Sequence, residues 1–386
     1  MSTKHALTDP VYEAGGKMLS MQDLLGYFAR AGRMRVSDLH LKVGSPPTYR
    51  FDGDLQAMNG PPLTADTAAA LIAGLLTDGE LERLAADGAV DSSYITDEYQ
   101  FRLNAFRESD GPAVAIRALE THIPPVEQIG FPNGVWQDLL GMKRGLVLVT
   151  GITGAGKSTT IASLIDRIAD TRACRVITLE DPVEYRLRSR RSMISQREVG
   201  RHVPSFERGL RDCLREDPDV IFVGEMRDRE STSWTLTAAE TGHLVFSTLH
   251  TRDARGTITR VLDMFPEGRQ DEVASQLSLG LRYVISQKLV PRSDGEGRVL
   301  AMETLNNTYA ISNLIRVRKL EQIYSHLQTR TRDIPEERMC SMERSLVQLV
   351  QRGVVAPLEA EKWAEDRNSF LDEMQRLGQS PPPPRG

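Results

Sequence analysis

Two patterns of apolar and polar residues divide the chain near residue 145. In the N-terminal part, Leu39, Leu41 and Val43 alternate with polar residues, a period of two that predicts a strand with one buried face. From Gly145 onward, helical stretches separate short apolar runs without polar alternation, such as GLVLVTG and GHLVFSTLH. Strands that are buried on both faces have this pattern, which favours an α/β domain with a parallel sheet.

The first 120 residues predict a small α+β domain. Asp52-Gly53 in RFDGDLQ is a typical hairpin turn. Thr64 can cap an alanine- and leucine-rich helical run that ends near Gly88. YQFRLNAF and PAVAIRAL then predict two further strands.

Proline content marks the segments that connect and end these domains. Pro124-Pro125 favours extended backbone, which is typical of a linker, and the final GQSPPPPRG cannot build a core. We expect a flexible N-terminal extension (1–18), the α+β domain (19–120), a linker (121–144), the parallel-sheet core (145–290), a helical C-terminal region (291–370) and a disordered proline-rich tail (371–386).

Composition predicts a soluble globular protein, and the cysteine pattern fits a reducing cytoplasm. The chain has 386 residues, 40% of them apolar and 26% charged, and no run of about 18 apolar residues that could span a membrane. Its three scattered cysteines argue against a disulfide framework or a structural zinc site. The net charge of -5 disfavours general binding to polyanions, so we expect no nucleic-acid partner.

The sequence GITGAGKS, residues 151–158, predicts a phosphate-binding loop. It matches G-x-x-x-x-G-K-[ST], follows an apolar strand and opens a helical run. In that context backbone N–H groups bind the phosphates of ATP, Lys157 adds a positive charge and the Ser158 hydroxyl can ligate Mg²⁺. A glycine-rich turn without a nucleotide is the alternative. The expected nucleotide-binding residues are Ile152, Thr153, Gly154, Ala155, Gly156, Lys157, Ser158 and Thr159.

Two acidic residues that end apolar runs are candidates for catalysis. Because ligands bind at the carboxyl ends of parallel strands, we expect Glu225 and Glu180 to face the γ-phosphate. Glu225 would orient or deprotonate water, and Glu180 would help to hold the water or the metal hydration shell; a helix cap is the alternative for each. Gly224 stands where many P-loop enzymes carry an Mg²⁺-binding aspartate, which favours contact with the metal through a water held by Glu225.

The segment TAAETGHLVFSTLHT places a histidine at each end of an apolar run. His243 and His250 lack the further partners at fixed spacing that a metal site needs. A strand between them puts His250 at its carboxyl end, where we expect it to sense the γ-phosphate. His243 is expected at the start of the strand, in contact with a neighbouring subunit or with the loop of Glu225. A core or capping role is the alternative for both.

Four segments, in order, resemble the motifs of one enzyme family. GITGAGKSTT, TLEDPVEY, REDPDVIFVGEMRD and TAAETGHLVFSTLHT are similar to the Walker A, Asp-box, Walker B and His-box segments of the type II/IV secretion ATPases. The likeness spans about residues 19–370 and is greatest to the retraction ATPases of type IV pili. It implies a RecA-like P-loop ATPase core, an N-terminal PAS-like α+β domain and a helical C-terminal region, assembled as a homohexamer.

The resemblance also implies how such a motor works. ATP lies between the two domains, and arginines of a neighbouring or opposing N-terminal domain complete the catalytic site at positions that match Arg102 and Arg117. Hydrolysis then drives pilus disassembly and twitching motility. The motor acts at the inner face of the cytoplasmic membrane, on a platform protein of that membrane, and a paralogous retraction ATPase is an optional partner.

Several alternatives stay open beside the retraction motor. The family's AIRNLIR segment reads AISNLIR here, with Ser312 in place of an arginine, which leaves room for an accessory paralogue. A type II secretion or pilus-extension ATPase is less favoured, because those relatives usually carry a zinc insert with four cysteines. A DNA translocase would use the six arginines between Tyr185 and His202, but no aromatic stacking platform accompanies them. A scaffold that only binds ATP would not need both catalytic glutamates.

Overall fold

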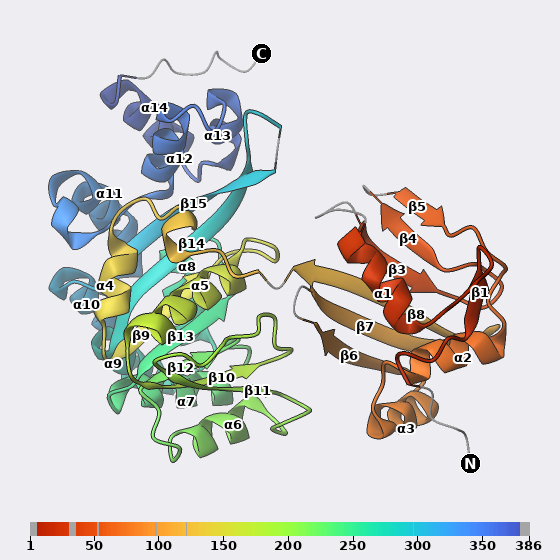
Figure 1. Ribbon diagram of the computed structural model, residues 1–386. Helices are drawn as coiled ribbons and strands as arrows, with labels where there is room; N and C mark the ends of the chain where they lie inside the picture. The colour runs from red at the N-terminus through yellow and green to blue at the C-terminus, as the bar shows by residue number, and fades with distance from the viewer. Residues whose placement is uncertain are drawn as a thin grey trace. The chain divides into compact units, whose positions relative to one another are not determined.

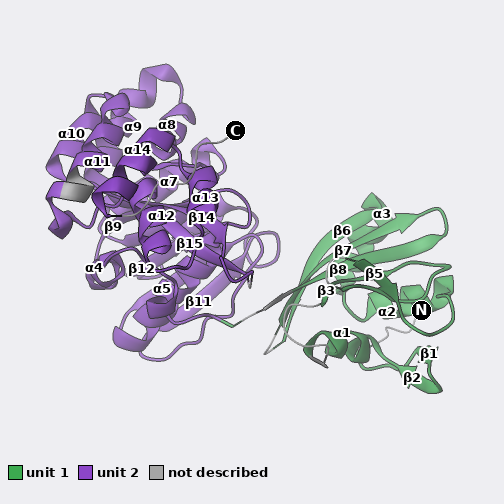
Figure 2. Cartoon of the chain, turned by 90° about the horizontal axis from the view of Figure 1, so that it is seen from above, with its two compact units in different colours: residues 1–122 green, residues 123–386 purple. Residues whose placement is uncertain are grey.

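The computed structural model describes residues 6–30, 36–51, 54–96, 99–120, 122–295 and 297–378. The chain forms two compact units, Met1–His122 and Ile123–Gly386, which are coloured separately in Figure 2. Each unit has its own main sheet, as Figure 1 shows. Each unit also has hydrophobic clusters of its own.

The N-terminal unit is an antiparallel sheet with helices packed on one face. Its strands are β3 (Val36–Leu41), β4 (Thr48–Phe51), β5 (Asp54–Ala57), β6 (Ala89–Ile95), β7 (Tyr99–Glu108) and β8 (Gly111–Glu120), and its helices are α1 (Met21–Arg30), α2 (Ala65–Ala73) and α3 (Asp78–Asp87). The strand order is β5-β4-β3-β8-β7-β6. Leu39 and Leu41 of β3 are buried in one cluster with apolar side chains of α1 and α2, as the alternation of β3 predicts.

Two caps divide the helical run that the sequence predicted as one. Thr64 caps α2, and its side chain accepts a hydrogen bond from the Thr67 N–H at 3.2 Å. Thr77 then begins α3 with a capping box, because its hydroxyl and the Glu80 carboxylate each accept a hydrogen bond from the other residue's N–H. Gly88, with φ of +80°, ends the second helix.

The N-terminal segment carries more structure than a flexible extension would. β1 (Tyr12–Ala14) pairs with β2 (Lys17–Leu19). Tyr12 is 2% exposed, and its hydroxyl donates to the Pro61 carbonyl at 2.9 Å. This buried aromatic side chain attaches the hairpin to the domain. The predicted turn at Asp52-Gly53 lies outside the described residues, while the flanking strands β4 and β5 pair antiparallel.

The C-terminal unit confirms the predicted α/β fold. Its sheet has the order β11-β10-β12-β13-β9-β14-β15, and among the described strands of this sheet the pair β14–β15 alone is antiparallel. The strands are β9 (Gly145–Thr150), β10 (Arg175–Glu180), β11 (Met193–Glu198), β12 (Val220–Val223), β13 (Leu244–Leu249), β14 (Leu281–Pro291) and β15 (Arg298–Asn306). All residues of β9, β12 and β13 are buried, as their continuous apolar runs predict.

Helices cover both faces of this sheet (Figure 1). Val147 and the apolar side of α5 (Lys157–Thr171) belong to one core, and Leu148 belongs to the core on the opposite face. The helices that contribute to that opposite core include α6 (Phe206–Cys213), α7 (Arg229–Glu240), α8 (Ala254–Asp263), α9 (Glu267–Gly280), α10 (Tyr309–Arg316) and α11 (Ile323–Asp333).

Two of the expected segments contain regular structure that the sequence did not predict. The expected linker contains η1 (Val126–Gln128) and α4 (Val135–Gly141), whose Val126, Val135 and Leu139 are at most 2% exposed in the core of α5. The expected helical region begins with strand β15, which pairs with β14 along nine residue pairs from Pro291 to Tyr283.

The end of the described chain is helical beyond the expected start of the tail. Three helices pack with Val290 and Ala301 of the sheet in a separate small core. The last helix ends at Arg376, and its Met374 is fully buried. Residues 379–386 lie outside the described part. No described helix combines the length and the apolar character that a membrane span requires. The three helices of the small core at the end of the chain are α12 (Met342–Gln351), α13 (Pro357–Trp363) and α14 (Arg367–Arg376).

Candidate active site

A glycine-rich turn between β9 and α5 has the backbone of an anion cradle. Gly151, Gly154 and Gly156 have φ of +145°, +79° and +87°, which residues with a Cβ rarely adopt. A Cβ on Gly151 would lie 2.6 Å from the carbonyl oxygen of Gln287. The expected residues 152–159 make up the rest of the turn and the first residues of α5, where helix N–H groups lack intrahelical acceptors.

Lys157 is the first residue of α5, and its side chain reaches back to this turn. Its side chain is buried, and Nζ donates to the carbonyl oxygens of Gly151 at 2.8 Å and Ile152 at 3.2 Å. Burial lowers the pKa of Lys157, while the negative charges of Glu225 and Glu184 act in the opposite direction. The turn therefore holds a positive charge next to its N–H groups.

The two candidate glutamates lie at the same edge of the sheet. β10 and β12 are parallel neighbours, with Leu179 opposite Val223, so that Glu180 and the residues after Val223 follow at equivalent positions. Gly224 is close to β10, because a Cβ there would lie 3.2 Å from the Leu179 carbonyl oxygen. A side chain at residue 224 would therefore require the neighbouring strand to shift by a few tenths of an ångström.

Glu180 is a buried carboxyl group in a polar network. Its Oε1 accepts hydrogen bonds from Thr178 Oγ1 at 2.6 Å and Gln196 Nε2 at 3.1 Å. Burial raises the pKa of Glu180 to about 7, and these hydrogen bonds oppose the rise. Gln196 also donates to the Tyr185 carbonyl, and the Tyr185 hydroxyl lies 2.7 Å from Thr159 Oγ1. Gln196 and Tyr185 were not among the predicted site residues.

Glu225 contacts the P-loop lysine through His250. His250 Nε2 lies 3.3 Å from Glu225 Oε1, and His250 Nδ1 lies 3.3 Å from Lys157 Nζ. His250 follows β13, which pairs with β9 up to Leu249 opposite Thr150. The structure therefore brings Lys157, Glu225 and His250 together, with Glu180 at the end of the neighbouring strand.

His243 lies at the opposite end of β13. Six strand residues separate the two histidines, a span of about 20 Å at the usual rise per residue. His243 Nδ1 lies 3.0 Å from the carbonyl oxygen of Ala238, at the C-terminal end of α7. The expected contact of His243 with the loop of Glu225 is wrong. Strands β12 and β13 are parallel neighbours, and Glu225 follows the carboxyl end of β12 while His243 precedes the amino end of β13. Within the chain His243 has the capping role that was the alternative.

Arg102 and Arg117 belong to the N-terminal unit. They are directly opposite each other on β7 and β8. Arg117 Nε donates to Asp38 Oδ1 at 2.8 Å. Burial acts to raise the pKa of Asp38, but the hydrogen bonds from Ser37 and Arg117 together with the Arg117 charge bring it below its usual value. The two arginines therefore share one face of the N-terminal sheet.

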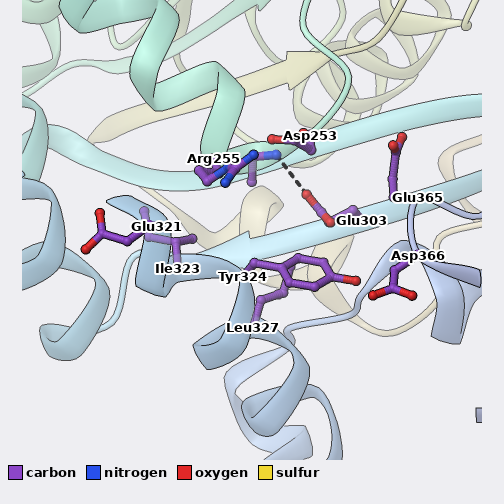
Figure 3. Close-up of a pocket in the computed structure, with 10 residues that line it drawn as sticks. Asp253, Arg255, Glu303, Glu321, Ile323, Tyr324, Leu327, Glu365 and Asp366 are labelled. Carbon is purple, nitrogen blue, oxygen red and sulfur yellow. Dashed lines mark hydrogen bonds between the residues drawn. The ribbon is translucent and has the colours of Figure 1, made fainter. Parts of the chain in front are cut away.

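A separate pocket of about 310 Å³ lies between β15, α11 and the start of α8 (Figure 3). Glu303 is 2% exposed there and accepts a hydrogen bond from the Ala254 N–H at 2.8 Å. Asp253 and Asp366 also line the pocket and cap α8 and α14. The two aspartates serve the fold as helix caps, and their negative charges would repel the phosphates of a nucleotide.

A family profile and the similar proteins described below all indicate the same family. The profile of the family described as "Type II/IV secretion system protein" matches residues 27–373. A "Twitching motility protein" of Neisseria gonorrhoeae is 41% identical over 84% of the chain and 86% of its own length. The "Type IV pilus retractation ATPase PilT" of Pseudomonas aeruginosa is 40% identical over 91% of the chain and its full length.

Two further comparisons bear on the choice within this family. The "Type IV pilus ATPase PilU" of Pseudomonas aeruginosa is 33% identical over 89% of the chain and 88% of its own length. A crystal structure of "the Pilus Retraction Motor PilT and Bound ADP" superposes with a TM-score of 0.81 at 41% identity, over 91% of the chain and 98% of the other. The chain is therefore more similar to these PilT sequences than to this PilU.

Proposed function

The chain belongs to the type II/IV secretion system protein family, and from this premise we propose that it is a hexameric ATP-hydrolysing motor that powers retraction of type IV pili. It is an ATPase, and its relatives include pilus retraction ATPases. The observation that carries the proposal is the meeting of Lys157, His250 and Glu225 beside the phosphate-binding turn.

Residues 152–159 bind the phosphates of ATP, and Lys157 changes its partners when they bind. A phosphate oxygen carries negative charge and forms a stronger hydrogen bond with an ammonium group than a neutral carbonyl does. Nζ therefore leaves the carbonyls of Gly151 and Ile152 for the nucleotide. The N–H groups of the first turn of α5 remain to bind the same phosphates.

Glu225 is the base of the reaction. Its Oε1 accepts the proton of the attacking water, which adds to the γ-phosphorus as the bond to the bridging oxygen of ADP breaks. His250 contacts both Glu225 and Lys157, so it can couple the position of the base to the presence of the γ-phosphate. Glu180, held by Thr178 and Gln196, supports the water from the neighbouring strand.

The oxygen donors beside the cradle fit Mg²⁺, which binds with ATP. Ser158 supplies a hydroxyl at the second position of α5, and Mg²⁺ usually takes one or two protein oxygens together with waters and substrate phosphates. Among the described residues, no group of three or more His, Cys, Asp or Glu side chains is placed to hold a metal ion alone. When bound, Mg²⁺ would neutralise charge on the β- and γ-phosphates.

The complete motor requires other subunits. Arg102 and Arg117 reach the phosphates from the N-terminal unit of a neighbouring subunit, and His243 contacts such a neighbour. Six chains form the ring, which works at the inner face of the cytoplasmic membrane on the pilus platform protein. The arginine pair on one sheet face supports this assignment, since two guanidinium groups would stabilise the developing phosphate charge.

One observation favours the accessory paralogue as a second candidate. Ser312 replaces the arginine of the family's AIRNLIR segment. Its hydroxyl donates to the Ser278 carbonyl at 2.8 Å, so the side chain is directed toward the end of α9. A serine in this position presents no charge to a partner. The higher identity to PilT than to PilU supports the retraction motor as the first candidate.

Steady-state hydrolysis and nucleotide binding test the active site together. Glu225→Ala should bind ATP normally and lose turnover by about 10²-fold or more. Lys157→Ala should lose ATP binding itself. Glu230→Ala is the matched control, because Glu230 lies on α7 and pairs with Arg229 outside the cradle. Turnover of Glu225→Ala equal to that of Glu230→Ala would remove Glu225 as the base.

A further inference from the structure

Arg227 bridges two acidic residues at the catalytic edge of the sheet. It lies between the end of β12 and the start of α7. Its Nε donates to Glu225 Oε2 at 2.8 Å, and its Nη1 donates to Asp181 Oδ2 at 2.8 Å. Glu225 follows β12 and Asp181 follows β10, so one guanidinium group connects the ends of two neighbouring parallel strands.

The bridge distinguishes the two oxygens of the Glu225 carboxylate. Oε2 is held by Arg227, and Oε1 lies toward His250 and through it toward Lys157. The guanidinium group is planar and presents its N–H groups in a fixed fork, so contacts from two of its nitrogens fix the direction of both acidic partners. The oxygen left for the substrate side is therefore Oε1.

The ion pairs of Arg227 contribute little to the stability of the fold. The side chains of Arg227 and Asp181 are 52% and 41% exposed, while that of Glu225 is 21% exposed. Exposed ion pairs contribute about 0.2–1 kcal/mol. Arg227 also has no part in the start of α7, because Asp228 is the residue that caps this helix. The remaining effect of Arg227 is on the orientation of the Glu225 carboxylate.

We propose that Arg227 is a positioning residue for hydrolysis: it clamps Glu225 to Asp181 so that Oε1, and not Oε2, receives the proton of the attacking water. This inference rests on the proposed function, since it gives Arg227 a task only if Glu225 is the base. Arg227 needs no contact with the nucleotide, so its loss should affect kcat and leave the KM for ATP unchanged.

The test compares Arg227→Met with Arg229→Met in the full chain, by steady-state ATP hydrolysis with Mg²⁺. Arg229 is a nearby exposed arginine that pairs with Glu230 and not with Glu225. We expect Arg227→Met to lower kcat by about 10- to 100-fold, because a base displaced by about 1 Å has that effect, with KM within about twofold. Arg229→Met should stay within about twofold of the unmodified chain in both constants.

Two further variants separate positioning from a general loss of structure. Arg227→Lys should recover part of kcat, because one ammonium group can hold Glu225 but cannot reproduce the fork. Asp181→Asn should lower kcat less than Arg227→Met, and the double variant should be no slower than Arg227→Met, because both changes release the same clamp. The circular dichroism spectra of all these variants should match that of the unmodified chain, and their Tm values should be close to its Tm.

Distinct results overturn this inference and the proposed function. If the unmodified chain does not hydrolyse ATP, the proposed function fails, and the inference fails with it. If that chain hydrolyses ATP and Arg227→Met matches Arg229→Met or exceeds the unmodified rate, only the clamp is wrong. A raised KM with unchanged kcat would place Arg227 in nucleotide binding and would also contradict the inference.

Discussion

At the scale of single residues, burial decides how several carboxyl groups of this chain ionise. Glu180 and Glu303 are 5% and 2% exposed, and burial raises their pKa values to about 7 and about 8. Both accept hydrogen bonds that favour the ionised form, but these bonds do not outweigh the loss of solvation. Both carboxyl groups therefore have raised pKa values, but they lie in different places. Glu180 is beside the phosphate-binding turn, and Glu303 lines the pocket of Figure 3.

Glu303→Gln should stabilise the protein more at high pH than at low pH. The folded-state pKa of Glu303 is about 8, above the ordinary 4.5, so the folded state retains the proton that the unfolded state releases. The free energy of unfolding of the unmodified chain therefore falls as pH rises from about 4.5 to about 8, and it falls no further from this group above that range. Glutamine can still accept the Ala254 hydrogen bond without becoming charged.

Thermal unfolding at pH 5.5, 7 and 8.5 measures this effect. The difference in Tm between Glu303→Gln and the unmodified chain should grow with pH and reach a few degrees at pH 8.5. Glu321→Gln is the control, because Glu321 lines the same pocket and is exposed. A difference that is constant across the three pH values would mean that Glu303 does not titrate in this range.

At the scale of helices and strands, the glycine turn between β9 and α5 is the element that the site depends on most. Gly151 combines a φ of +145° with a close approach to the Gln287 carbonyl of β14. Gly151→Ala should therefore lower the free energy of unfolding by about 1–3 kcal/mol through backbone strain alone, and it should weaken ATP binding. The clash with β14 adds to that loss.

Chemical denaturation and nucleotide titration check the Gly151 variant against a matched one. Gly268 lies in α9 with no atom near the position of an added Cβ, so Gly268→Ala should keep ATP binding and gain up to about 1 kcal/mol. Equal free energies of unfolding and equal ATP affinities of the two alanine variants would show that the turn does not require glycine at residue 151.

The sequence predicted the parallel strands well because their apolar runs are continuous. β9, β12 and β13 are fully buried, and the short length of these runs between turn signals favoured strands over helices. β15 was missed because RVLAMETLN has no alternation and contains good helix formers, and only pairing with β14 makes it a strand. α4 was missed because the prolines before it indicated a linker.

The candidate site was predictable where one residue carries its own signal. The P-loop motif identified Lys157, and strand ends identified Glu180, Glu225 and His250. Arg227 and Gln196 were not identified, because an arginine or a glutamine at the surface is common and their partners come from other strands. Such contacts depend on the sheet order, which the local pattern does not give.

At the scale of the whole molecule, the division into two units matters for the motor. The N-terminal unit carries arginines on its sheet, and the C-terminal unit carries the phosphate-binding turn and the acidic residues. In the proposed ring, hydrolysis in one subunit depends on arginines from another. Closing and reopening of domains around the nucleotide would then turn chemistry into movement.

Arg102→Ala should slow hydrolysis about 10³-fold and leave the fold of the subunit intact, because an arginine that stabilises the transition state has an effect of at least that size. Arg107→Ala is the matched control, since Arg107 is an exposed arginine on the same strand β7. ATPase assays on the assembled protein, with circular dichroism for the fold, measure both variants. Unchanged turnover in Arg102→Ala would remove this residue from the catalytic site.

The most direct test of the central claim is a count of surface pili and of twitching motility in cells that lack the gene. Deletion should leave excess pili and no twitching, and the unmodified chain should restore both to normal. The Glu225→Ala chain should restore neither, because the motor needs hydrolysis. Normal pili in the deletion strain, or full rescue by Glu225→Ala, would contradict a retraction motor driven by this ATPase site.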